Sequence, residues 1–296
     1  MTARGIKVVR EHLAKHPAPA DVAEKRAQYD RAERVFKTPA DVRVEPLEGA
    51  GVPGEWLVPA GARTDAAVLY LHGGGYVIGS PRSHRHVAAA IASAAGIAAM
   101  LPDYRLAPEH PYPAAVDDAV AAYVWLLRRG IAPGRIVIAG DSAGGGLTVA
   151  TLIAIRQRGR PLPAAGVCIS PWVDLTCSAA SYTTRAEADP MVTRDGVAEM
   201  ARLYLAGADA KTPLASPLHA DLKGLPPLLI QVGDDEVLLD DSTQLAAQAK
   251  AAGVSADVEV WPEMIHVWHW FLPMLDEAQR AVTRIGDFVK GHLRPA

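Results

Sequence analysis

The sequence is poor in cysteine and has little excess charge. Cys168 and Cys177 are its two cysteines among 296 residues, and its formal net charge is −3. This cysteine content argues against a secreted, disulfide-stabilised protein, and Cys168 lies in an apolar run where a thiol packs as a small hydrophobe. The acidic and basic residues are interspersed, which argues against nucleic-acid binding and against a polybasic membrane patch.

Long apolar runs are also missing. The longest, such as GIAAML, are far too short to cross a bilayer, and the N-terminal residues lack the apolar centre of a signal peptide. We therefore expect a cytoplasmic protein that does not enter a membrane. The chain has no H-E-x-x-H, no C-x-x-C and no G-x-G-x-x-G after a strand, so we expect neither a metal nor a cofactor.

What the chain does contain is enough apolar sequence for one large core, because half of its residues are hydrophobic. Short apolar runs predict buried strands at 66–72, 97–101, 135–139, 165–170, 227–232 and 256–261. Longer patterns predict helices near 84–95, 113–129, 144–158, 239–252 and 273–293. This alternation is typical of an α/β fold with a mostly parallel central sheet and helices on both faces.

Two segments interrupt the alternation. Residues 1–44 are charged and helix-like without a strand, and the second half of 180–215 resembles an amphipathic helix. Because a long insertion in a compact domain is more often functional than neutral, we interpret both as parts of a lid over the sheet. The alternative is a surface extension together with a long connection.

The segment Gly140-Asp141-Ser142-Ala143-Gly144 matches G-x-S-x-G at the junction of a predicted strand and helix. This context is what a nucleophile elbow requires, because a sharp turn holds the serine in strained backbone geometry with its oxygen exposed. The flanking glycines allow neighbouring backbones to approach closely. A glycine-rich turn capped by Asp or Ser is the alternative.

A second glycine motif, His72-Gly73-Gly74-Gly75, directly follows another predicted strand. Consecutive glycines let the backbone curl so that several N–H groups point into one site. Such a loop supplies oxyanion donors in esterases, together with the N–H of the residue after the nucleophile. Each motif is weak alone, but the two together are specific.

With these residues in place, the sequence resembles the bacterial hormone-sensitive-lipase-like esterases (family IV) of the α/β-hydrolase fold. The resemblance runs from about residue 66 to the C-terminus. It implies ester hydrolysis on small acyl groups, no cofactor and a small helical cap. We accordingly divide the chain into an N-terminal cap segment (1–44) and an α/β-hydrolase domain (45–296) with a cap insertion at 180–215.

The family motifs also imply roles for individual residues. By position, Gly74, Gly75 and Ala143 match the oxyanion hole, and Gly73 matches the glycine that shapes the turn. The YRLAPE segment (104–109) is expected to be structural, with Arg105 and Glu109 as a supporting ion pair.

A serine nucleophile needs a histidine base, and the chain order in this fold is serine, acid, histidine. That order leaves four of the ten histidines: His219, His266, His269 and His292. His292 lies close to the chain end, His219 precedes every plausible acid, and His269 is expected to pack at the start of the next helix. His266 follows the strand ending at 261, where chemistry is usually placed in open α/β sheets, and it matches the family's histidine.

The acid is expected after the strand at 227–232, where five acidic residues lie between 234 and 241. The usual family pattern D-x-L-x-D falls on Glu236-Val-Leu-Leu-Asp240, which predicts Glu236 as the acid, with Asp235 as the alternative. A glutamate can orient the imidazole and stabilise the imidazolium as an aspartate does. Asp240 and Asp241 are interpreted as first-turn residues that favour the following helix dipole.

These residues predict a carboxylesterase that hydrolyses short- to medium-chain esters through an acyl-enzyme. The alternatives are a non-hydrolytic small-molecule-binding protein on the same fold, and a thioesterase or peptidase with the same triad. Candidate residues for the pocket lining are Tyr182, Met191, Val192 and Tyr204. The expected partner is a small ester, and the sequence is compatible with a homodimer.

Overall fold

The computed structural model describes residues 5–49 and 51–295. Its centre is an eight-stranded sheet with the order β1-β2-β4-β3-β5-β6-β7-β8, in which β2 pairs antiparallel with β1 and β4 and all other pairs are parallel. The strands are Val42–Pro46 (β1), Gly54–Pro59 (β2), Arg63–Leu71 (β3), Ile97–Pro102 (β4), Ile136–Asp141 (β5), Ala165–Ile169 (β6), Leu228–Gly233 (β7) and Ala256–Trp261 (β8).

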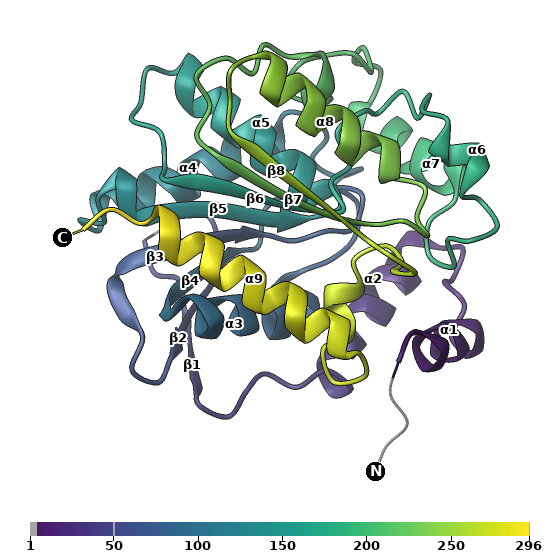
Figure 1. Cartoon of the computed structure of the whole chain (residues 1–296), viewed down its shortest axis with the longest axis horizontal. Coiled ribbons are helices and arrows are strands. Elements are labelled where there is room, and N and C mark those ends of the chain that lie inside the picture. The colour runs from purple at the N-terminus through teal and green to yellow at the C-terminus, as the bar shows by residue number, and fades with distance from the viewer. Residues whose placement is uncertain (1–4, 50, 296) are drawn as a thin grey trace.

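Helices cover both faces of the sheet (Figure 1). One face is covered by Pro81–Ala95 (α3) and Asp276–His292 (α9), and the other by Ala114–Arg128 (α4), Ala143–Gln157 (α5) and Leu239–Ala251 (α8). The predicted α/β architecture, its six strands and its five helices are therefore confirmed. The expectation that 256–261 is a buried strand is wrong, because β8 lies at the edge of the sheet and only its first residue, Ala256, is buried. Short 3-10 turns lie at Arg31–Arg34 (η1), Pro133–Arg135 (η2), Pro217–His219 (η3) and Trp268–Phe271 (η4).

Local sequence explains where these elements begin and end. The helix α3, for example, begins after Ser80, whose side chain accepts a hydrogen bond from the Ser83 N–H, and Pro81 occupies the first turn. It ends at Gly96, whose φ of 69° is a left-handed conformation that glycine adopts without strain.

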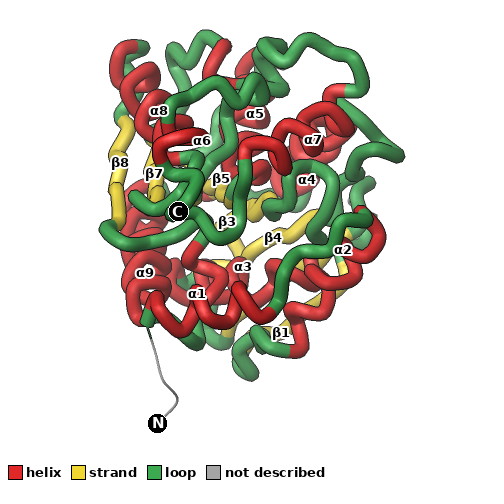
Figure 2. Tube along the Cα trace, turned by 90° about the vertical axis from the view of Figure 1, so that its right-hand side faces the viewer, coloured by secondary structure: helices red, strands yellow, loops and turns green. Residues whose placement is uncertain are grey.

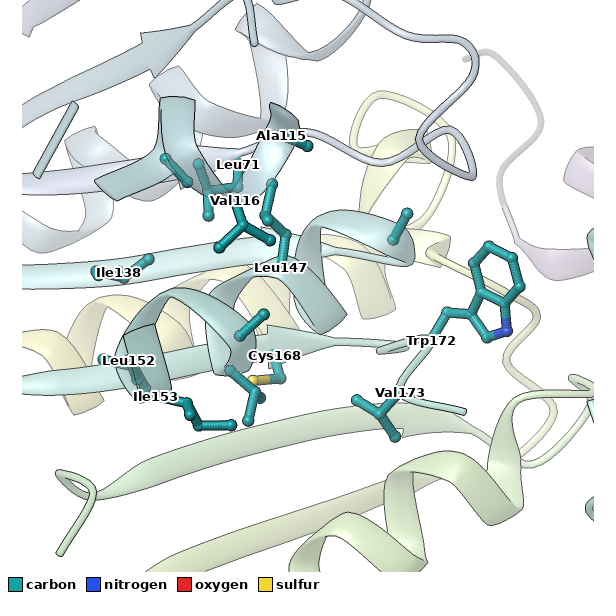
Figure 3. Packing of buried hydrophobic residues seen from close by; sticks show 14 of the residues in the cluster. Leu71, Ala115, Val116, Ile138, Leu147, Leu152, Ile153, Cys168, Trp172 and Val173 are labelled. Carbon is teal, nitrogen blue, oxygen red and sulfur yellow. The ribbon is translucent and has the colours of Figure 1, made fainter. Parts of the chain in front are cut away.

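The core lies between the sheet and its helices. Figure 3 shows Leu147, Leu152 and Ile153 of α5 gathered with Ile138 of β5 and Cys168 of β6, all of them buried. Cys168 is buried, as its apolar sequence context predicted, and Cys177 is buried as well; both are free. Within the described part of the chain, no helix combines the length and the apolar character needed to cross a membrane.

Four helices lie together at one end of the sheet, on the right in Figure 1 and toward the viewer in Figure 2. Two come from the N-terminal segment, Ile6–Lys15 (α1) and Val22–Asp30 (α2), and two from the 180–215 segment, Ser181–Thr184 (α6) and Arg194–Leu205 (α7). The amphipathic helix predicted in the second half of 180–215 is therefore present as α7.

The expectation that residues 1–44 contain no strand is wrong for the last three residues of that segment. The strand β1 begins at Val42 and pairs with β2 at the edge of the sheet. Most residues of β1 are exposed or half-buried, so the strand lacks the continuous apolar run that marks a buried strand. The strand β2 was not predicted either.

Candidate active site

Ser142 lies in the sharp turn between β5 and α5 with φ 54° and ψ −122°, a strained conformation for a residue with a side chain. Its N–H donates to the Ile169 carbonyl (2.8 Å), and its carbonyl accepts from the Trp172 N–H (2.9 Å). A Cβ on Gly140 or Gly144 would collide with backbone atoms of the same turn and of Leu71. The expected steric role of both glycines is therefore visible in the structure.

The glycine loop after β3 faces the same turn. Gly74 and Gly75 have φ of 118° and 61°, and both line one cavity together with Ser142. A Cβ on Gly74 would collide with the Ile78 carbonyl, and one on Gly75 with the sulfur of Met200 in α7. Ala143 is buried behind Ser142 as the first residue of α5, where the backbone N–H has no partner within the helix.

Asp141 connects these two loops, a role that the sequence analysis missed. Its Oδ1 accepts hydrogen bonds from the Tyr70 hydroxyl (2.7 Å) and the Gly73 N–H (3.1 Å), and its Oδ2 lies 3.4 Å from Nε2 of His84. Burial alone would raise the pKa of Asp141, but the charge of His84 and hydrogen bonds from His84 and Tyr70 outweigh burial and lower the pKa. Asp141 is the last residue of β5, and a carboxylate at the carboxyl end of a strand could have indicated from the sequence that it binds a neighbouring loop.

His266 and Glu236 are in direct contact. His266 lies in the loop between β8 and η4, and its Nδ1 is 3.0 Å from Oε2 of Glu236, which is fully buried in the turn between β7 and α8. Burial raises the pKa of Glu236, and the hydrogen bond and charge of His266 oppose that rise only in part. Burial alone would lower the pKa of His266, but the hydrogen bond and charge of Glu236 outweigh burial, and the pKa is raised.

The alternative acid, Asp235, has a different partner. Its Oδ2 lies 2.6 Å from Nη2 of Arg10 in α1, and its side chain is partly exposed. Asp240 and Asp241 lie in the first turn of α8, as expected. Asp241, however, is buried and accepts hydrogen bonds from the Val173 and Asp174 N–H groups (both 3.1 Å), so it also holds the loop after β6.

The other three candidate histidines, His219, His269 and His292, have partners other than Ser142 or its acid. Nε2 of His219 is 3.1 Å from Asp174, and His292 bonds to the Phe288 carbonyl within α9. His269 is buried beside Gln231 (2.8 Å), in η4 rather than at the start of α9. Among these four histidines, only His266 lines the cavity that contains Ser142.

That cavity has a volume of about 340 Å³, and of the four helices at this end of the sheet α2 and α7 contribute to its walls. Met191 and Val192 line it, as proposed, whereas Tyr182 and Tyr204 do not. Both tyrosines are buried in the core, and Tyr204 stacks on Tyr76 with ring centres 3.9 Å apart. The sequence analysis missed further apolar lining residues, among them Tyr29, Ile78, Trp172, Val197, Met200, Val267 and Trp270.

The expected ion pair between Arg105 and Glu109 is wrong. Arg105 instead binds Asp118 in α4 (2.7 Å), and Glu109 binds Arg26 in α2 (2.8 Å). Arg26 also donates to the Val77 and Ala107 carbonyls (both 2.8 Å). The YRLAPE segment is therefore structural, but its ion pairs are formed with other elements. The pair between Glu109 and Arg26 holds α2 beside the glycine loop.

The arrangement offers a strained serine, a histidine held by a carboxylate and the backbone of Gly74 and Gly75 around one cavity. This set suits nucleophilic acyl transfer. In the described ranges 5–49 and 51–295, no group of three or more His, Cys, Asp or Glu side chains is placed to hold a metal ion.

Comparisons with known proteins agree with this geometry. A family model described as the alpha/beta hydrolase fold matches residues 68–270. The chain is 49% identical to an acetyl-hydrolase of Streptomyces hygroscopicus, over 98% of this chain and 97% of that one. It is 34% identical to an esterase of Acinetobacter venetianus, over 88% and 86% of the two chains.

Solved structures give the same result. The chain superposes on an esterase from the bacterial hormone-sensitive lipase family with a TM-score of 0.93, 52% identity and coverage of 98% of this chain and 97% of that one. The esterase EstE5, in a crystal soaked with p-nitrophenyl butyrate, gives a TM-score of 0.93 and 50% identity over 98% and 99% of the chains. The chain therefore belongs to the α/β-hydrolase fold family and, within it, to the bacterial hormone-sensitive-lipase-like esterases.

Proposed function

We propose that this protein is a serine carboxylesterase in which Ser142 is the nucleophile, His266 the general base and Glu236 the residue that orients His266. The observation that carries this proposal is the 3.0 Å contact between His266 and Glu236 beside the cavity that Ser142 and the glycine loop also line. Because Nδ1 of His266 faces Glu236, Nε2 is the nitrogen left to take the serine proton.

The reaction proceeds in two halves. The oxygen of Ser142 forms a bond to the ester carbonyl carbon while His266 takes the hydroxyl proton, and the resulting oxyanion accepts hydrogen bonds from the N–H groups of Gly74, Gly75 and Ala143. The bond to the alcohol oxygen then breaks, and the alcohol leaves with the proton from His266. Water repeats the sequence on the acyl-enzyme, which releases the carboxylic acid and restores Ser142.

The cavity supports short- to medium-chain esters as substrates. Its walls are largely apolar, and its volume of about 340 Å³ suits a small ester rather than a long lipid. Of the predicted cap segment 1–44, residues 1–4 lie outside the described residues and 42–44 belong to β1. Residues 5–41 and 180–215 are proposed as the cap. A cytoplasmic location is supported by the two free, buried cysteines. A homodimer would be supported by the exposed sheet edge at β8, where Val260 is 46% exposed.

The proposal is tested with p-nitrophenyl esters of acetate, butyrate, octanoate and dodecanoate. We expect the largest kcat/KM among the shorter three and a fall at dodecanoate, because the longest chain exceeds the cavity. Matched thioester and p-nitroanilide substrates distinguish the thioesterase and peptidase alternatives, which would be favoured by faster turnover of those probes. Absence of hydrolysis with every probe would point to a binding protein.

The pH dependence of the same reaction gives a second expected result. His266 must be neutral to accept the serine proton, and Glu236 raises the pKa of His266 above the ordinary 6.5 despite its burial. The kcat/KM for p-nitrophenyl butyrate should therefore rise with pH and reach half its maximum above pH 6.5. A midpoint below that value would contradict the assigned pair.

A further inference from the structure

Asp189 lies in the connection between α6 and α7 and contacts two parts of the site at once. Asp189 is buried, with 6% of the residue exposed. Oδ1 accepts hydrogen bonds from the N–H groups of Met191 and Val192 (both 2.9 Å), which line the cavity. Oδ2 accepts from the N–H of Val237 (3.0 Å), the residue that directly follows Glu236.

Other bonds hold the same turn from the same side. The Ser181 hydroxyl donates to the Val237 carbonyl (2.6 Å), so both polar backbone groups of Val237 are bound by the 180–215 segment. On the other side of Glu236, Arg10 of α1 bridges Asp235 (2.6 Å) and the Ala188 carbonyl (2.8 Å). Both neighbours of Glu236 are therefore fastened to the segments over the cavity.

These bonds to the neighbours of Glu236 are important because Glu236 is not part of a strand and is not held by the hydrogen bonds of the sheet. It falls in the turn between Gly233, the last residue of β7, and Leu239, the first residue of α8. The position of its carboxylate consequently depends on what holds that turn. A buried N–H without an acceptor is destabilising, so we expect the Val237 N–H, and the turn with it, to move if Asp189 cannot accept from it.

We propose that Asp189 is a positioning residue that sets the location of Glu236 through the Val237 N–H and so couples the segments over the cavity to the acid–histidine pair. This inference rests on the proposed role of Glu236. Asp189 does not touch the reacting atoms. Its effect on turnover passes through Glu236 and His266.

Electrostatics supplies a readout that a purely structural role would leave unchanged. The negative charge of Asp189 contributes to the raised pKa of both Glu236 and His266. The other groups that act on His266 are the carboxylates of Glu236 and Asp141, which raise its pKa. His269 is coupled to His266 too, and burial keeps the pKa of His269 low, at about 3.

The test is Asp189→Asn in the full-length chain. An asparagine can accept from one side but cannot present a second carboxylate oxygen to Val237. We expect kcat for p-nitrophenyl butyrate to fall about 10- to 100-fold with KM changed by less than about twofold. The acid limb of kcat/KM should move to lower pH, because a charge that raises the pKa of His266 is removed.

The matched control is Asp21→Asn, the same change at the N-cap of α2. Asp21 accepts a hydrogen bond from the Glu24 N–H and does not bond to the turn between β7 and α8 that carries Glu236. It should leave kcat and the pH profile unchanged. A double-mutant cycle completes the experiment: in a Glu236→Gln background, Asp189→Asn should lower kcat by less than about twofold further, because the residue through which it acts is already disabled.

The outcomes are distinguishable. Unchanged kcat with a lowered Tm, a raised KM with unchanged kcat, or full additivity in the cycle would each overturn the inference. If Asp189→Asn does not fold, Ser181→Ala removes the other bond to Val237, and an unchanged kcat in that variant would equally overturn it. Full activity of Glu236→Gln alone would instead remove the proposed role of Glu236.

Discussion

Replacing Ser142 by alanine is expected to lower kcat for p-nitrophenyl butyrate by about 10⁴- to 10⁶-fold. Only the nucleophilic oxygen is lost. The strained turn stays, because it is held by backbone bonds from Ile169 and Trp172 and not by the serine side chain. The variant should therefore keep its fold and its affinity for the ester.

Steady-state kinetics together with thermal unfolding measure this result. Burst kinetics of p-nitrophenol release provide a second measurement, because an acyl-enzyme can accumulate in the parent protein and cannot form in the variant. A Ser142→Ala protein with activity within about tenfold of the parent would show that another group is the nucleophile.

Replacing Glu236 by glutamine is expected to lower kcat by about 10³- to 10⁴-fold, whereas Asp235→Asn should cost less than about tenfold. A neutral amide in place of Glu236 can select the wrong imidazole tautomer and no longer stabilises the imidazolium. Asp235 is bound to Arg10 in α1 and is partly exposed, so its loss loosens the turn without removing the partner of His266.

The two variants make a matched pair, since each exchanges one carboxylate for an amide at adjacent positions. Comparing their kcat with the same ester, and their Tm values, separates chemistry from stability. The reverse order of effects, with Asp235→Asn the slower enzyme, would transfer the role of the acid to Asp235.

The features predictable from sequence were those carried by local patterns. Apolar runs predicted the strands β3 to β8, of which β8 is an edge strand that is mostly exposed or half-buried, and glycines at strand ends predicted both loops around Ser142. The edge strand β1 was missed because it is short and largely exposed. Its stability comes from pairing with β2, which no local pattern reports.

The errors share a cause, which is that the partner of a polar or aromatic side chain can come from anywhere in the chain. Arg105 and Glu109 are four residues apart in one loop, yet each pairs with a residue of a helix, Arg105 with Asp118 of α4 and Glu109 with Arg26 of α2. Asp141 and Asp189 were missed for the same reason. Tyr204 looked suited to line a pocket, but an aromatic ring can equally stack within the core, as it does on Tyr76.

The backbone bonds of Ser142 have a consequence for how the site opens. The serine N–H bonds to Ile169, the last residue of β6, and the serine carbonyl bonds to Trp172 in the chain that follows β6. The nucleophile therefore cannot leave its place unless β5 and β6 separate, an event close to global unfolding. Glu236 has no such ladder around it. Local unfolding should therefore disconnect the acid long before it disturbs the nucleophile, so that partial denaturation yields an intact elbow without its base in position.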